Sequence, residues 1–176
     1  MKRLISVIMA LSLAVAAFSQ NQAIRPRVEI ATVEVNEGEL VLEVFRMEDN
    51  GIYYLSLGPL GIGNDVIQVQ VDPISELFIP LGGTLAEASE TLNQMKDLYK
   101  REPGETIEMQ GCISVLFPSD KLETVNVTSR KVLLSRMLEF SVGREGYIHA
   151  THIGKSDFNS LVTTFNLYRK VHPKQK

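Results

Sequence analysis

The chain contains one cysteine, Cys112, and no tryptophan among its 176 residues. An internal disulfide is therefore excluded, and the fold must be held together by apolar burial. Cys112 lies in the alternating run from Ile107 to Phe117, on the phase opposite to its large apolar residues. We interpret it as a packed, inert thiol, because its glycine and isoleucine neighbours supply no activating charge. The lack of tryptophan argues against carbohydrate binding, in which sugars stack on aromatic rings.

Basic tracts and catalytic motifs are also missing. Lysine and arginine number 18 against 21 acidic residues, and the net charge of −3 is spread along the chain, which argues against nucleic-acid binding. No serine lies in the Gly-x-Ser-x-Gly setting of a nucleophile elbow. The glycine-rich stretch Gly58 to Asp65 has no Lys-Ser/Thr ending and is not followed by a helical pattern, so it is not a phosphate-binding loop. The sequence specifies no reaction, and no cofactor or metal is predicted.

The N-terminus has the pattern of an export signal. Lys2 and Arg3 precede an apolar run from Leu4 to Ala17, and small residues favour cleavage between Ser19 and Gln20. The run is shorter than the roughly 20 residues that a membrane-spanning helix needs. We therefore expect an exported chain, periplasmic or secreted, with a signal peptide at 1–19, a polar leader at 20–27, a single domain at 28–172 and a flexible basic tail at 173–176.

The rest of the chain predicts an α+β domain with a largely antiparallel sheet of meander hairpins. Apolar stripes at steps of three and four predict two amphipathic helices, at about 84–102 and 156–170, packed on one face of that sheet. Thr84 and Glu87 have the spacing of a capping box, and Ser156 is expected to cap the second helix. Alternating or extended runs predict strands at 28–35, 40–45, 52–57, 66–71, 74–81, 106–117, 122–128, 131–142 and 147–153.

Three local features sharpen this prediction. Asn50-Gly51 between two apolar runs indicates a β-hairpin with a tight type I′ turn. Pro80 cannot donate a ladder hydrogen bond, so its strand is expected to lie or end at a sheet edge. The stretch from Gly58 to Asp65 is expected to be a long hairpin loop.

The candidate chemical groups are two histidines and a set of acids. His149 and His152 are three residues apart within a predicted strand, so they should face opposite sides, which argues against a shared metal. Acids are numerous in the first hairpins, and we interpret them as a solvated face. Glu34, Glu43 and Glu48 could instead meet in space and hold a cation or protonate a sugar bond.

The leading hypothesis is a non-enzymatic exported domain that binds a protein or small ligand in the cell envelope or outside it. Its expected partner surface is the 58–65 loop, helped by one ring of the Tyr53-Tyr54 pair. The first alternative is a small hydrolase or metal-dependent enzyme that combines a histidine with acids of the N-terminal hairpins. The second is a carrier of lipid or another apolar ligand. The candidate binding residues are Leu60, Ile62, Asn64, Asp65, Tyr54, His149 and His152.

Overall fold

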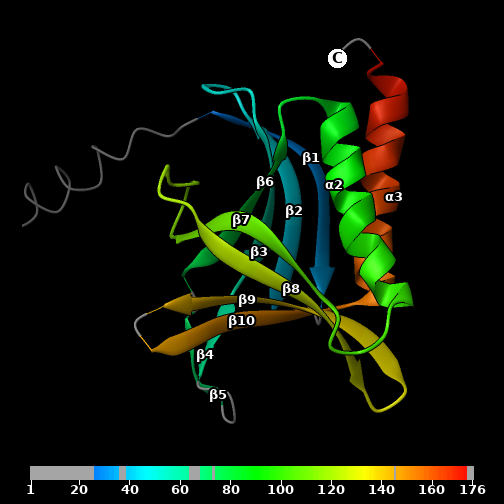
Figure 1. Ribbon diagram of the computed structural model, residues 1–176. Coiled ribbons are helices and arrows are strands. Elements are labelled where there is room, and N and C mark those ends of the chain that lie inside the picture. The colour runs from blue at the N-terminus through cyan, green and yellow to red at the C-terminus, as the bar shows by residue number, and fades with distance from the viewer. Residues whose placement is uncertain (1–25, 36–38, 64–67, 73, 145, 174–176) are drawn as a thin grey trace, which may run out of the picture.

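The computed structural model describes residues 26–35, 39–63, 68–72, 74–144 and 146–173. In these ranges it is mostly an antiparallel β-sheet with two α-helices, as the sequence predicts at this level (Figure 1). The strands are β1 (Arg27–Val35), β2 (Leu40–Met47), β3 (Tyr53–Gly58), β4 (Leu60–Gly63), β5 (Gln68–Asp72), β6 (Glu76–Gly82), β7 (Thr106–Ser114), β8 (Glu123–Val132), β9 (Ser135–Arg144) and β10 (Tyr147–Gly154). The helices are α2 (Leu85–Asp97), continued by a 3₁₀ turn (Leu98–Lys100), and α3 (Lys155–Val171).

The sheet curls strongly, and its strand order explains why. The order is β1-β2-β3-β6-β7-β8-β9-β10-β4-β5, so β3 and β4 stand far apart in the sheet. Only Pro59 separates them along the chain, and two successive peptide units span at most roughly 7–8 Å. The sheet must therefore turn back on itself until β4, paired with β10, comes close to β3. The result is a half-barrel.

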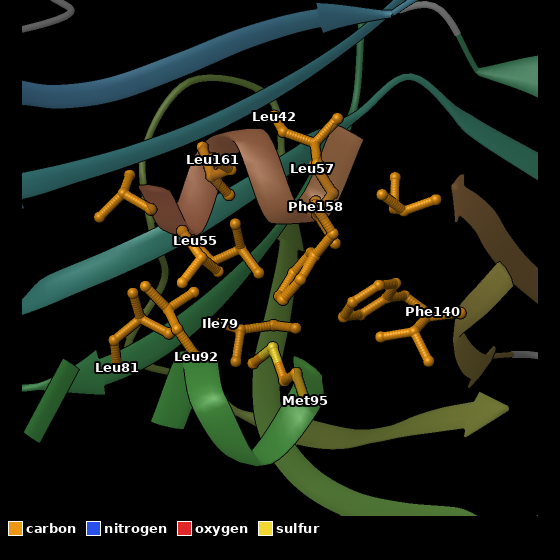
Figure 2. Packing of buried hydrophobic residues seen from close by; sticks show 14 of the residues in the cluster. Leu42, Leu55, Leu57, Ile79, Leu81, Leu92, Met95, Phe140, Phe158 and Leu161 are labelled. Atoms are coloured by element: carbon orange, nitrogen blue, oxygen red, sulfur yellow. The ribbon is translucent and has the colours of Figure 1, made fainter. Parts of the chain in front are cut away.

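Side chains of the main hydrophobic core fill the space between the helices and the sheet. Leu92 and Met95 of α2 and Phe158 and Leu161 of α3 are fully buried and point toward strand residues such as Ile79 (Figure 2). α3 contacts β1 and β2, while α2 contacts β6 and α3. The steps of three and four that predicted the helices are thus the steps that place apolar side chains in this core.

The helix ends follow local hydrogen bonding. α2 begins with the predicted capping box: the Glu87 amide donates to Thr84 Oγ1 at 3.2 Å, and Glu87 Oε2 accepts from the Thr84 amide. The prediction for Ser156 is wrong, because α3 begins one residue earlier and Gly154 occupies the N-cap position without a side-chain cap.

Several strand predictions need correction. Residues 60–63 of the predicted loop form β4. The hairpin at Asn50-Gly51 is present, but its turn covers 48–51, and only Gly51 has a positive φ, of 71°, so it is not a type I′ turn. A non-glycine residue with a positive φ, Leu133, occupies another turn, between β8 and β9, that no sequence signal indicated.

Pro80 lies in a central strand, against the edge prediction, since β6 runs between β3 and β7. However, β7 pairs with β6 only over residues 76–78. Pro80 lies beyond that stretch and has a strand partner, Tyr54, on one side only. At Pro80 one side of β6 is therefore unpaired. The prediction rested on the lack of a backbone N–H in proline, and no ladder hydrogen bond is lost at such a position.

We predict that Leu92→Ala lowers the free energy of unfolding by about 2–5 kcal/mol, because it leaves a cavity at a fully buried contact between α2 and the core. Urea denaturation followed by circular dichroism measures this loss. Gln94→Ala, on the exposed side of the same helix, should change stability by less than about 0.5 kcal/mol. Equal effects of the two substitutions would contradict the described packing.

Candidate functional site

Strand β2 is buried on both of its faces. Leu42 and Val44 point into the main core, whereas Phe45 and Met47 belong to a second apolar cluster on the opposite face. This second cluster also contains Tyr54, Phe78 and Cys112. Glu43 shares the phase of Phe45 and Met47 and is consequently only 7% exposed. A charged residue so placed needs partners, because buried charge is costly.

Strand pairing gathers two polar residues around Glu43. Ser56 on β3 lies directly opposite Glu43 on β2. The Ser56 hydroxyl donates a hydrogen bond of 2.5 Å to Oε2 of Glu76, the first residue of β6. Gly58 makes room for this acid, since a Cβ at Gly58 would come within 2.8 Å of Cγ of Glu76. Two carboxyl groups and a hydroxyl therefore meet on the outer face of three adjacent strands.

Glu43 is only half satisfied. Its Oε2 lies 3.2 Å from Nη2 of Arg27, whose guanidinium also covers the Phe45 ring at 5.0 Å. Its Oε1 is buried and has no hydrogen-bond partner among the described residues. Such an orphaned acceptor is rare in folded proteins and calls for a physical explanation.

The electrostatics of Glu43 agree with this picture. Burial raises its pKa above the ordinary value of 4.5, and the Arg27 charge opposes that rise. The negative charges of Glu29 and Glu76 raise the pKa further. The fold thus favours the neutral form of Glu43 more than an exposed position would, and any added positive charge nearby would favour the ionised form.

A cavity of about 220 Å³ opens beside these groups. The side chains of its lining residues carry two carboxyl groups and two hydroxyls, beside a valine and a proline. Among these side chains hydrogen-bond acceptors outnumber donors, which suits a ligand that donates hydrogen bonds and carries positive charge. The lining residues are Val41, Glu43, Ser56, Gly58, Pro59, Ser75 and Glu76.

The described residues of the surface expected at 58–65 are partly or fully buried. Leu60 is 1% exposed and belongs to the main core, so it offers no contact to solvent. Ile62 is partly buried in β4, opposite His149 of β10. Tyr54 is also covered, at 7% exposure, in the second cluster. Asn64 and Asp65 lie outside the described residues.

The two histidines do not converge. His149 pairs with the core residue Val142, and His152 pairs with Glu139, so they face opposite sides of β10. His152 Nε2 lies 3.1 Å from Glu139 Oε2, and Arg130 also binds this carboxylate. Burial disfavours the charged form of Glu139, but these two partners outweigh it and lower its pKa below 4.5.

Within the described part of the chain, no three His, Cys, Asp or Glu side chains are placed to hold a metal ion. There, too, no hydrogen bond or ion pair links either histidine to the acids of β1 and β2. No described contact therefore supports the hypothesis of an enzyme that combines a histidine with the acids of the N-terminal hairpins. Cys112 is buried and unpaired, as predicted, and burial raises its pKa, so its thiol form is favoured.

The interpretation of the early acids as a solvated face holds for Glu34 and Glu48, which are exposed, and is wrong for Glu43. A signal was present in the sequence. Phe45 and Met47 follow Glu43 at steps of two, so its face of β2 had to be apolar. The contribution of Glu76 could not be found in this way, because it depends on strand register.

No family model, curated protein or solved structure matches this chain. In the described ranges no helix is both long enough and apolar enough to cross a bilayer.

We predict that Glu43→Gln stabilises the fold at about pH 7.5 and that the gain shrinks as the pH falls. In the folded chain the Glu43 pKa is raised, so its contribution to stability is complete below about pH 4.5 and is lost as the pH rises through the folded pKa. Glutamine imitates the protonated form at every pH. Urea denaturation across this range measures the difference.

The matched control is Glu34→Gln, because Glu34 is an exposed acid on the neighbouring strand β1. It should give no pH-dependent difference from the wild-type chain. A Glu43→Gln chain that is less stable than wild type at about pH 7.5 would show that the ionised carboxylate is well satisfied, against the geometry described above.

Proposed function

We propose that this chain is a non-enzymatic binding domain that takes a small organic cation, a primary ammonium or guanidinium group, in the pocket formed by Glu43, Ser56 and Glu76. The observation that carries the proposal is the buried Oε1 of Glu43, which has no described hydrogen-bond partner and belongs to a residue that lines this cavity. A cationic donor would satisfy that atom and remove the cost of leaving it orphaned.

The charge balance supports a cation. Glu43 and Glu76 supply two carboxylates, whereas Arg27 is the one basic side chain with a described ion pair there. With Glu43 in its ionised form, one further positive charge would neutralise the pair of acids. Because Glu43 is shielded from water, its attraction for a cation is stronger than it would be at an exposed site.

The size of the cavity favours an organic cation. Its volume of about 220 Å³ corresponds to roughly seven water molecules, which suits a short alkylammonium chain. Val41 and Pro59 provide apolar contact for such a chain beside the carboxylates. Calcium would prefer six to eight oxygen ligands, more than two carboxylates and two serines provide without many waters.

The arrangement of layers is part of the proposal. We infer that α2 and α3 pack on one face of the sheet and leave the outer face of β2, β3 and β6 for the ligand. The contacts of α3 with β1 and β2, and of α2 with β6, support this division. The space between helices and strands is filled by core side chains such as Leu92 and Phe158, which favours a site outside it over an internal carrier cavity.

We further propose that the domain acts after export, in the cell envelope or outside the cell, with cleavage near Ser19-Gln20. The apolar run behind Lys2 and Arg3 supports this. The small, evenly spread net charge supports a partner other than nucleic acid.

The test uses n-butylammonium as the probe and neutral n-butanol, of similar shape, as its control ligand. Nuclear magnetic resonance titration should show that n-butylammonium shifts the backbone amide signals of Ser56 and Glu76, while n-butanol does not. Glu43→Gln and Glu76→Gln should each weaken binding by about tenfold or more, as expected for loss of a charged hydrogen bond. Affinity should rise with pH as Glu43 loses its proton.

Glu34→Gln serves as the control variant and should bind the probe as wild type does. Equal binding of n-butanol would contradict a charge-selective site. Binding of Ca²⁺ at the same residues, with no response to n-butylammonium, would show that the pocket belongs to a metal and overturn the proposal.

A further inference from the structure

The turn between β8 and β9 is made of two leucines. Val132 pairs with Ser135, so Leu133 and Leu134 form a two-residue hairpin turn. Leu133 is 91% exposed and Leu134 is 96% exposed, and Val132 beside them is half exposed. This hairpin extends beyond the neighbouring strands, in yellow at the lower right of Figure 1. A projecting apolar tip of this kind is a feature of interaction sites.

The backbone of this turn is also unfavourable for leucine. Leu133 has a φ of 54°, in the left-handed region that glycine and asparagine adopt readily and a Cβ-branched or bulky side chain does not. A two-residue hairpin turn with a positive φ at its first position alone accordingly favours glycine there. The exposed apolar area and the strained backbone of the tip are both unfavourable, and nothing described within the fold offsets them. Strain of this kind is typical of functional segments.

The flanks of the tip are basic in a chain that is acidic overall. The segment 130–137 contains Arg130, Lys131 and Arg136 and no acid. Arg130 is paired with Glu139, whereas Lys131 is exposed at the base of the turn. A groove of about 550 Å³ beside the tip is lined by Leu133 and Met137 together with Arg136 and Lys155. Apolar and cationic groups thus alternate over this end of the molecule.

We propose that the β8–β9 tip docks on an anionic lipid surface. Leu133 and Leu134 enter the boundary between headgroups and acyl chains, while Lys131, Arg136 and Lys155 lie at the level of the lipid phosphates. This combination of apolar insertion with basic flanks is the physical basis of peripheral membrane binding.

The shape of the tip favours a lipid surface over a protein partner. A stable protein interface buries on the order of 800 Å² on each partner, far more than two side chains at a narrow turn supply. Lipids, in contrast, surround a projecting tip on all sides. The basic flanks also attract anionic lipids. A second copy of this acidic chain would offer negative charge to them only in patches.

The experiment measures co-sedimentation of the full chain with vesicles of phosphatidylcholine alone and of phosphatidylcholine mixed with phosphatidylglycerol. We expect binding to the mixed vesicles, weakened by salt, and little binding to phosphatidylcholine. The double substitution Leu133→Gly with Leu134→Asn should lower vesicle affinity by about tenfold or more and at the same time raise the thermal unfolding midpoint, because glycine adopts the positive φ at position 133 without strain. A more stable chain that has lost binding cannot be explained by misfolding.

The control is Leu167→Gln, which removes an apolar side chain that is 57% exposed on α3, away from the tip. It should bind vesicles as wild type does. Every variant carries the same N-terminal segment, so differences among them report on the substituted residues. Binding that is equal on both vesicle types, or unchanged by the double substitution, would overturn the proposal. So would absence of vesicle binding together with a dimer, seen by light scattering, that the double substitution dissociates.

Discussion

The structure depends on the burial of the central strands β2, β3 and β6 from both sides. On one face their side chains belong to the main core, and on the other Phe45, Tyr54, Phe78 and their neighbours form the second cluster. Polar residues near the middle of β2 and β3, such as Glu43 and Ser56, are therefore removed from water. Glu43 is such a residue, and the chain provides it with one partner for two oxygens. The candidate pocket is a consequence of this two-sided burial.

Closure of the sheet explains why the pocket has its particular walls. The chain passes from β3 to β4 through a single residue, although the two strands lie at distant places in the strand order. Pro59 stands at this passage and lines the cavity, next to Gly58, whose missing side chain leaves space for Glu76. The β8–β9 hairpin extends past the neighbouring strands (Figure 1), and none of its residues lines the Glu43 cavity, so the two proposed sites are separate.

Sequence periodicity could predict the class of the fold because it records which side chains must avoid water. The capping box at Thr84 and the apolar stripe through Leu92 correctly predicted the start and the buried face of the first helix. Strand order, the passage at Pro59 and the pairing of Ser56 with Glu43 depend on contacts between distant segments, which single-strand patterns do not encode. The leucine turn at 133–134 was missed for the opposite reason: its residues contradict every local signal for a turn. Sites that break local rules are the ones that local rules cannot find.

The central claim is that Glu43 is a buried carboxyl group with one oxygen that has no described hydrogen-bond partner, and that this oxygen binds a cation. A carbon-13 magnetic resonance titration of the Glu43 side-chain carboxyl measures this directly, in the wild-type chain with and without n-butylammonium. The account predicts a pKa above 4.5 without the cation and a lower one with it. A pKa at or below 4.5 without the cation, or one that the cation leaves unchanged, would contradict it.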